Sequence, residues 1–430
     1  MERGKFGTAS VMSLKALGPQ DEYTLNKDQP VFEHSIRQYT DFSIDQITLP
    51  FGNNPYPGTV QRVEIDPRTF GGDLISNMHL ALRLPKIETG NTFTENIGRA
   101  LIKSFTLSLN EQVIETVTSD WLVVRDQIFL DDDEKTAMGY LINGGYSINT
   151  DEFKKEYSRK PFEVDIIIPL EFFFSRRHSP YRRTRDRTTR PFFPICAVKN
   201  QKVYVTIEFN NASYFTNYEK PFDFVNQASL VIESITLTQE ERLKYLEPMS
   251  IVINKVYREP QTDISTAAGR FNLTVNFPVT SSFWFFRKKN HEKDTVDVFD
   301  SHFKFGYTYT ENIIYKARDP FEYLTFFVNN KENTPAVEGK NFFKYLQPVN
   351  YNLSTPTNEI YMYSFGITPK EYNTGGSMDF SKIPSKSTYI IYKMDKRIAY
   401  DVETNYTFNM YHYGYNMIRF SDGYASLVFL

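Results

Sequence analysis

The sequence has few of the features that cross-link a chain or hold it in a membrane. It contains one cysteine, Cys196, among 430 residues, so no intramolecular disulfide can form, and a reducing compartment is expected. The densest apolar run, residues 164–170, is much shorter than the roughly 18 residues of a membrane-spanning helix. The amino-terminal residues are charged and lack the apolar stretch of a secretory signal. These absences predict a soluble protein of the cytosol.

The sequence also lacks the local patterns of most enzymes and metal sites. The six histidines are scattered, and none has a partner at a metal-ligand spacing. No nucleophile elbow, phosphate-binding glycine loop or EF-hand loop occurs. Cys196 follows an apolar Pro-Phe-Phe-Pro-Ile segment, where a thiol is more often an inert small hydrophobe than a nucleophile. We therefore expect no catalytic residue, no metal, no cofactor and no enzymatic activity.

Charge of one sign is also not in excess. The 49 Lys and Arg residues are balanced by 52 Asp and Glu residues, for a net charge of -3, so no overall field attracts nucleic acid or an acidic membrane surface. Aromatic residues, by contrast, are abundant at 16%, mostly 37 Phe and 29 Tyr. Because aromatic side chains favour pleated, half-buried surfaces over helices, the composition predicts a β-rich protein.

Short segments of alternating apolar and polar residues occur twice along the chain, over about two hundred residues each time. In residues 202–209, for example, Val203, Val205 and Ile207 share one face of the predicted strand. The sequence predicts an N-terminal arm at 1–25, a first domain at 26–225 and a second at 226–430, with many short strands and few helices. The predicted strands are 42–49, 59–65, 74–84, 102–109, 112–116, 162–168, 202–209, 230–237, 251–257, 271–277, 283–286, 323–328, 360–365, 389–392 and 426–430.

One helix is expected at the start of the second half. Thr238-Gln-Glu-Glu241 matches a capping box, in which the threonine hydroxyl and the glutamate carboxylate each accept a backbone hydrogen bond. Pro248 is expected to end this helix.

The strongest local anomaly is an arginine-rich segment, residues 176–190, between two predicted strands. Such density suits phosphate binding or pairing with carboxylates, and the single aromatic residue in the segment, Tyr181, argues against a single-strand nucleic-acid binder. We favour ion pairing between subunits, for example with the acidic run 131–134 of a neighbour. The interface or outer-loop candidates are Asp131, Asp132, Asp133, Arg176, Arg177, Arg182, Arg183, Arg185, Arg187 and Arg190.

The acidic run begins a long polar excursion, residues 131–160. Oxygen-only clusters suit calcium or magnesium, but no second acidic cluster with a glycine turn accompanies this one. We therefore interpret the run as the solvated start of a loop that is functional or mobile.

Six segments together resemble a known family in sequence and order. They are residues 18–32, 39–43, 235–242, 277–279 with 283–286, 377–383 and 415–427. The most specific are the stretch from Phe277-Pro-Val to Trp284 and the stretch Tyr415-Asn-Met-Ile-Arg419. In this order they resemble the major capsid proteins of nucleocytoplasmic large DNA viruses. The arginine-rich segment interrupts the family pattern, so the resemblance implies no role for it.

The resemblance implies an all-β fold of two tandem eight-stranded antiparallel jelly rolls, a double jelly roll, with a few short helices in loops. It also implies a homotrimer whose six rolls form a pseudo-hexagonal capsomer that tiles an icosahedral shell. The implied partners are neighbouring capsomers, and minor capsid proteins or an internal membrane at the N-terminal arm, with no specific nucleic acid. The chain is then expected in the virion, after assembly in the host cytoplasm.

Two alternatives stay open at this point. A β-sandwich also suits a carbohydrate-binding or carbohydrate-active protein, which would need an aromatic-lined cleft with converging polar groups. A minor capsid protein or a virophage shell component would share the resemblance.

Overall fold

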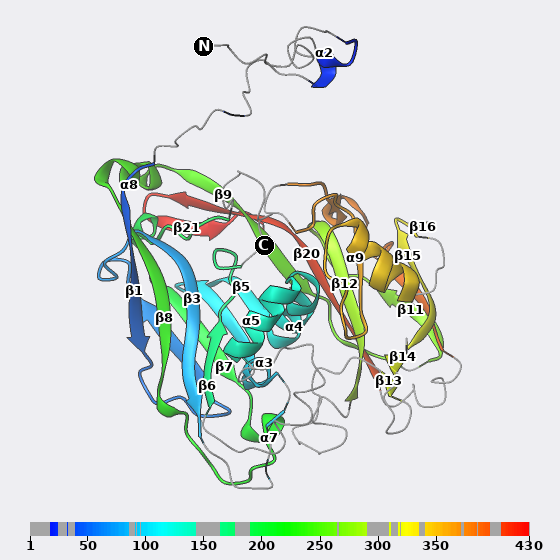
Figure 1. Cartoon of the computed structure of the whole chain (residues 1–430), viewed down its shortest axis with the longest axis horizontal. Helices are drawn as coiled ribbons and strands as arrows, with labels where there is room; N and C mark the ends of the chain where they lie inside the picture. The colour runs from blue at the N-terminus through cyan, green and yellow to red at the C-terminus, as the bar shows by residue number, and fades with distance from the viewer. Residues whose placement is uncertain are drawn as a thin grey trace, which may run out of the picture. The chain divides into compact units, whose positions relative to one another are not determined.

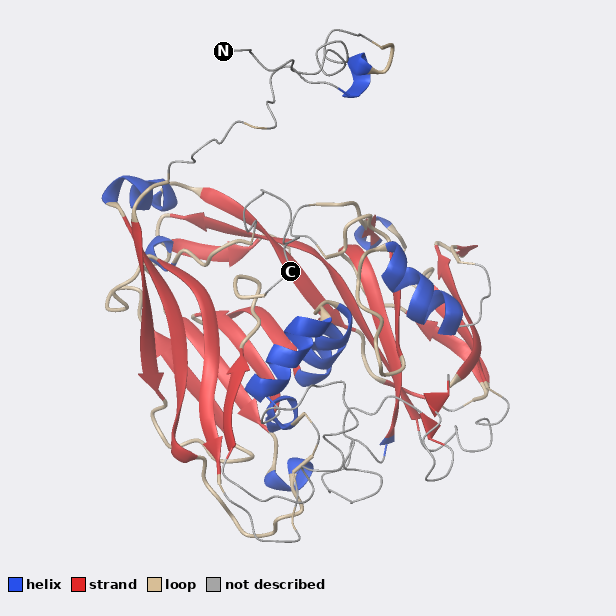
Figure 2. Ribbon diagram, viewed as in Figure 1, coloured by secondary structure: helices blue, strands red, loops and turns tan. Residues whose placement is uncertain are grey.

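The computed structural model describes residues 18–24, 32, 39–85, 91, 93–94, 96–142, 164–176, 190–264, 266–289, 309–310, 317–318, 320–334, 340–370, 374–384, 386–395 and 406–429. The chain divides into two units, Met1–Asp41 and Phe42–Leu430. Within the described part of the first unit lies one short helix, α2 (Asp21–Thr24). All other described elements belong to the second unit, in which strands predominate (Figures 1 and 2).

Two four-stranded sheets make up the first half of this unit, with the strand orders β1-β8-β3-β6 and β2-β7-β4-β5. Every ladder in them is antiparallel. The strands are β1 (Phe42–Pro50), β2 (Val60–Ile65), β3 (Leu74–Leu84), β4 (Ile102–Leu109), β5 (Gln112–Thr118), β6 (Val164–Pro169), β7 (Val203–Phe209) and β8 (Val225–Leu237).

The second half contains a seven-stranded sheet, whose main strand order is β9-β20-β12-β17, and a four-stranded sheet of order β11-β19-β15-β16. The main strands are β9 (Met249–Arg258), β11 (Ala268–Asn272), β12 (Pro278–Lys288), β15 (Phe321–Val328), β16 (Lys331–Glu332), β17 (Ile360–Ser364), β19 (Tyr389–Met394) and β20 (Tyr406–Ser421). The short strands β10 (Thr262–Asp263), β18 (Met378–Asp379) and β21 (Tyr424–Leu427) join the first of these sheets, and β13 (Tyr309–Thr310) pairs with β14 (Ala317–Arg318).

The two halves repeat one topology. In chain order within each half, the first main strand pairs with the eighth, the eighth with the third, and the third with the sixth. The second pairs with the seventh, the seventh with the fourth, and the fourth with the fifth. Two such interleaved four-stranded sheets make a jelly roll, so the predicted double jelly roll is confirmed. We call residues 42–237 the first roll and residues 249–427 the second roll.

A pair of surface side chains is repeated at equivalent positions of the two rolls. On the second and seventh strands of the first roll, Arg62 lies over the ring of Tyr204 at 3.6 Å. On the second and seventh strands of the second roll, Arg270 lies over Tyr389 at 3.5 Å. In both cases the tyrosine is paired with the residue two positions after the arginine. The two rolls are therefore similar in surface detail as well as in topology.

Alternation of apolar residues explains most strands. In β3, Met78, Leu80, Leu82 and Leu84 are buried, whereas the residues between them are half-buried. β20 differs because residues on both of its faces are buried over 406–414, so it lacks the period-two pattern, and it was not among the predicted strands.

Helices lie mainly in the connections between strands. Residues 132–142 of the predicted polar excursion form a helix, and residues 143–163 lie outside the described part. Among the described residues no helix is long and apolar enough to cross a membrane. The helices are α3 (Ile97–Leu101), α4 (Ser119–Ile128), α5 (Asp132–Ile142), η2 (Ile195–Ala197), α7 (Ala212–Phe215), α8 (Gln239–Leu246), η4 (Lys340–Leu346), α9 (Gln347–Asn350) and η5 (Phe380–Lys382).

Helix α8 lies where the capping box predicted a helix. Thr238 is its N-cap residue, but its side chain makes no capping hydrogen bond. All described strands of the first two sheets precede α8, and those of the other sheets follow it. The predicted boundary at residue 225 stays a prediction, and β8, which starts there, pairs with β1 and β3 of the first roll.

Candidate functional site at the junction of the two rolls

In the sheet β9-β20-β12-β17 of the second roll, β12, β17 and residues 406–414 of β20 are buried on both faces. On β12, Trp284 and Phe286 point into the core of the second roll. Their neighbours Phe283 and Phe285 belong to the core cluster of the first roll. One sheet therefore serves as a wall of both cores, and we call the contact between its outer face and the first roll the junction.

Helix α4 supplies the first roll's side of the junction. The ring of Trp121 lies 5.6 Å from that of Phe283, 5.7 Å from that of Tyr411 and 5.8 Å from that of Tyr413. Phe129, just after the helix, contacts two of the same rings. Aromatic pairs at these separations contribute stability beyond the area that they bury.

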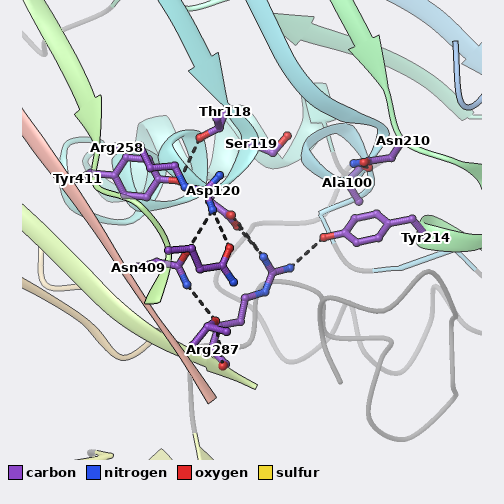
Figure 3. A network of polar contacts seen from close by, with 12 residues as sticks. Ala100, Thr118, Ser119, Asp120, Asn210, Tyr214, Arg258, Arg287, Asn409 and Tyr411 are labelled. Carbon is purple, nitrogen blue, oxygen red and sulfur yellow. Dashed lines mark hydrogen bonds and ion pairs between the residues drawn. The ribbon is translucent and has the colours of Figure 1, made fainter. Parts of the chain in front are cut away.

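A network of polar contacts includes Tyr411 of this aromatic cluster (Figure 3). Arg287 of β12 donates to Asp120 at 3.1 Å and to the Tyr214 hydroxyl at 2.9 Å. The hydroxyls of Thr118 and Tyr411 lie 3.1 Å apart. Since 167 residues separate Asp120 from Arg287 along the chain, this network holds together distant parts of the sequence.

Buried charges lie beside the network, on the first roll. Arg99 donates to both carboxylate oxygens of Asp126, at 2.9 and 3.0 Å. Arg125 pairs with Glu171. Burial alone would lower the pKa of Arg99, but Asp126 and Glu171 raise it above its ordinary value. The charge of Arg99 is therefore stabilised by its partners, whereas at Glu171 burial outweighs the attraction of Arg125 and Arg99 and raises the pKa above its ordinary value.

Arg176, a predicted interface residue, belongs to this buried region. It forms an ion pair with Glu115 and donates to the backbone carbonyl of Asn254 on β9 at 3.0 Å. Its side chain thus links the two rolls within one chain. Burial of an arginine at such a place requires this kind of pairing.

Arg190, at the other end of the arginine-rich segment, lies on the outer face of sheet β1-β8-β3-β6. It donates to Asn77 Oδ1 at 3.1 Å and lies 5.7 Å from the Phe192 ring. Arg176 and Arg190 lie in different environments, because Arg176 is buried and Arg190 is half-buried. The remaining predicted arginines, Arg177, Arg182, Arg183, Arg185 and Arg187, lie outside the described residues.

The acidic run is the start of helix α5. Asp131 accepts a hydrogen bond from the Glu134 backbone N–H at 2.8 Å, and Glu134 accepts one from the Asp131 backbone N–H at 3.1 Å. Asp132 and Asp133 are exposed in the first helical turn, where carboxylates are favoured by the helix dipole. Among the described residues, no group of acidic, histidine or cysteine side chains is arranged to hold a metal ion. The acidic run thus caps a helix, and its predicted role at an interface stays a prediction.

A buried serine, histidine and glutamate lie in line in the second roll. Ser282 Oγ lies 2.7 Å from His412 Nδ1, and His412 Nε2 lies 3.1 Å from Glu259 Oε1. Such an order also occurs in hydrolases, but here Ser282 and His412 have no exposed surface. A substrate carbonyl cannot reach the serine in this state, and the three residues act as a structural link between β12, β20 and the residue that follows β9.

Glu259, the last of these three residues, is held in place by further hydrogen bonds. It accepts hydrogen bonds from the backbone N–H groups of Thr274 and Val275 and from the Thr274 hydroxyl, at 2.6–3.1 Å. Burial alone would raise the pKa of Glu259, but the bonds from His412 and Thr274 hold it below its ordinary value. The carboxylate is thus kept ionised inside the roll.

Cys196, the one cysteine, is buried in the first roll. Burial, with a smaller effect of Asp73, raises the pKa of its thiol to about 11. A thiol with this pKa is a poor nucleophile at neutral pH, as the apolar sequence around Cys196 predicted.

Comparison with known proteins identifies the family. A model of the large eukaryotic DNA virus major capsid protein matches residues 233–426, and a model of the major capsid protein N-terminus matches residues 30–254. The second match alone covers more than half of the chain. The chain belongs to this family of major capsid proteins.

Individual relatives agree over almost the full length. The major capsid protein of Pyramimonas orientalis virus is 21% identical, over 97% of this chain and 98% of the relative. That of Paramecium bursaria Chlorella virus 1 is 22% identical over the same shares of the two chains. The resemblance predicted from the six segments is confirmed, and the chain is a structural component of a large DNA virus capsid.

Solved structures show the same fold. The VP54 protein of Paramecium bursaria Chlorella virus 1 matches with a TM-score of 0.74 at 17% identity, over 93% of this chain and all of that chain. The major capsid protein of Faustovirus matches with a TM-score of 0.68 at 12% identity, over 96% of this chain and 97% of that chain. Identities this low support the fold alone.

Proposed function

We propose that this capsid protein forms a homotrimer whose six jelly rolls make one pseudo-hexagonal capsomer of an icosahedral shell. The observation that carries the proposal is the repetition of one roll within the chain, in strand order and in the Arg62–Tyr204 and Arg270–Tyr389 pairs. Three copies of two similar rolls give six similar units around a threefold axis, a closed arrangement that lets one chain tile a surface. A chain of the same fold is part of the capsid of Paramecium bursaria Chlorella virus 1.

The mass of the purified chain in solution tests the trimer. Light scattering after size-exclusion chromatography should give three times 50.3 kDa, unchanged on dilution, because each copy in a closed ring is held by two contacts. A mass of 50.3 kDa at micromolar concentration would contradict the proposal.

The other partners follow from the same role. We propose that residues 1–25 contact minor capsid proteins or an internal membrane, that neighbouring capsomers bind the sides of the trimer, and that assembly takes place in the host cytoplasm. The inert, unpaired Cys196 is compatible with a reducing compartment. In this role the chain acts by its surfaces, without catalysis. A chain that lacks residues 1–25 should keep the mass of a trimer and lose binding to minor capsid proteins or to vesicles.

A further inference from the structure

The junction inside one chain uses a specific part of each roll. Helix α4 lies in the connection between the fifth and sixth strands of the first roll. It packs on the outer face of the sheet made by the first, eighth, third and sixth strands of the second roll, through Trp121, Phe283 and Tyr411. The same two parts exist once more in the chain, in the opposite rolls.

The equivalent connection of the second roll is the segment η4–α9, residues 340–350, between β16 and β17. Its inner side is held to the second roll by the buried ring of Phe343 and by the ion pair of Lys344 with Glu359 at 2.8 Å. Its outer side exposes three apolar side chains, which are 38%, 47% and 62% exposed. These are Tyr345, Leu346 and Val349.

Among the described residues, the equivalent sheet face of the first roll has half-buried and exposed side chains. On sheet β1-β8-β3-β6 the apolar residues Leu80, Leu82 and Ile232 point into the first core. Their neighbours on the strands therefore form the outer face, which includes Ala81, His79, Val231 and Ile167, with Ile167 exposed and the others half-buried. Ala81 and Ile167 face each other across the β3–β6 ladder and form a small apolar patch. It is bordered by the exposed Arg83–Asp165 ion pair on one side and by Asn77, which accepts a hydrogen bond from Arg190, on the other.

One chain cannot bring these two surfaces together. In Figure 1 the sheet β1-β8-β3-β6 lies at the left of the body formed by residues 42–430, and α9 lies at its right. A contact between these two surfaces therefore needs a second molecule.

We propose that the η4–α9 segment of one copy packs on the outer face of sheet β1-β8-β3-β6 of the next copy, as α4 packs on β9-β20-β12-β17 within the chain. The proposal rests on the homotrimer proposed above and names its contact surfaces. The occupant is a second copy, because the chain already joins these two kinds of surface at the junction. The contact joins two different patches, so it is heterologous, and in the trimer proposed above three such contacts would close the ring.

Matched charge substitutions test the contact. Val349→Asp and Ile167→Asp each place a carboxylate in the proposed apolar seam, and each should raise the dissociation constant of the trimer by about 30-fold or more. The control is Val60→Asp, since Val60 and Val349 are the same residue type and both are 62% exposed, but Val60 lies on β2 in the other sheet. Val60→Asp should leave the mass of three chains unchanged. Circular dichroism of each variant checks that the fold is kept.

Cysteine cross-linking tests which surfaces meet. Since Cys196 is buried, introduced cysteines report without interference. A mixture of Val349→Cys chains and Ile167→Cys chains, assembled together and treated with a short bismaleimide, should give a covalent dimer. Neither variant alone should do so, because a heterologous seam does not place a residue against its own copy.

The outcomes separate the two proposals. If the native chain is monomeric, the trimer itself is contradicted. Suppose instead that the native chain is a trimer, that Val349→Asp and Ile167→Asp remain trimeric as Val60→Asp does, and that the mixed cysteines do not cross-link. The contact between copies then lies elsewhere, and only this inference is overturned.

Discussion

Two buried arginines make hydrogen bonds between the two rolls. Arg176 reaches the backbone of β9, and Arg287 reaches Asp120 on α4. Arginine suits such positions because its planar guanidinium donates several hydrogen bonds in fixed directions and stays charged when it is buried. Arg287 pairs with Asp120 of the first roll, and Arg176 pairs with Glu115 of its own roll. These ion pairs hold both arginines in position where the two rolls meet.

Removal of one such side chain should be costly. Arg287→Ala deprives Asp120 and the Tyr214 hydroxyl of their donor and should lower the free energy of unfolding by about 3 kcal/mol. Denaturant unfolding at neutral pH measures the change. The control, Lys103→Ala, breaks the exposed Lys103–Glu208 pair and should cost less than about 1 kcal/mol. Equal costs for the two substitutions would show that the Arg287 contacts do not stabilise the junction.

Glu259 should make the free energy of unfolding depend on pH. Its pKa in the folded chain lies below the ordinary value of 4.5, so its contribution is complete above about pH 4.5 and is lost as pH falls through the lower, folded value. Glu259→Gln should lower the free energy of unfolding by about 2 kcal/mol at pH 7. The gap between native chain and variant should shrink at about pH 3. Unfolding at both pH values checks this, and a gap of constant size would contradict the assigned role.

At the scale of the element, strand β20 is the centre of the second roll. It pairs with β12 over most of its length and with β9 over 411–420. Gly414 lies where β12 changes register between Val279 and Ser281. A Cβ atom at Gly414 would collide with the carbonyl oxygen of Pro278 and lie 2.8 Å from the Phe277 ring. The close approach of the two strands therefore requires glycine.

Gly414→Ala should consequently destabilise the chain by about 2 kcal/mol, because the backbone of β12 must move to admit the methyl group. Thermal or denaturant unfolding measures the loss. Gly52→Ala is the matched control, since a methyl group there would have open space within 4 Å, and it should change stability by less than about 0.5 kcal/mol. Comparable stability of the two variants would argue against the close packing of β12 and β20.

Elements with one buried face could be predicted from the sequence, and elements buried all round could not. The predicted strands 74–84 and 102–109 coincide with β3 and β4, because apolar residues alternate in them. β20 and α4 are buried on nearly all sides, so neither shows a period that distinguishes inside from outside. The polar character of residues 131–160 predicts a loop, whereas Asp131 and Glu134 cap helix α5.

The contacts at the junction of the two rolls could not be predicted from the sequence either. Arg176 was grouped with an exposed arginine-rich segment because charge density normally indicates a surface. Its burial depends on Glu115 and on the backbone of β9, and these partners are far away in the sequence. The junction network likewise joins residues such as Thr118 and Tyr411, which are 293 positions apart, and no local pattern indicates such a contact.

At the scale of the whole molecule, the shared sheet couples the two rolls. Because β9-β20-β12-β17 has one face in each core, neither roll can unfold without exposing apolar surface of the other. The chain therefore has two cores but is expected to unfold as one cooperative unit.

The two tryptophans of the chain test this coupling. Trp121 lies at the junction and Trp284 lies in the core of the second roll. In Trp284→Phe only Trp121 reports, and in Trp121→Phe only Trp284 reports. After correction for the stability change of each variant, measured by circular dichroism, each fluorescence transition should coincide with the loss of β-structure in the same variant. A fluorescence transition that precedes the loss of β-structure would mean that the rolls unfold separately.

Electron cryo-microscopy of the purified assembly tests the central claim most directly. The account predicts six similar jelly rolls around a threefold axis, with the η4–α9 segment of each copy against sheet β1-β8-β3-β6 of the next copy. Isolated monomers, or a dimer about a twofold axis with this sheet exposed to solvent, would contradict it.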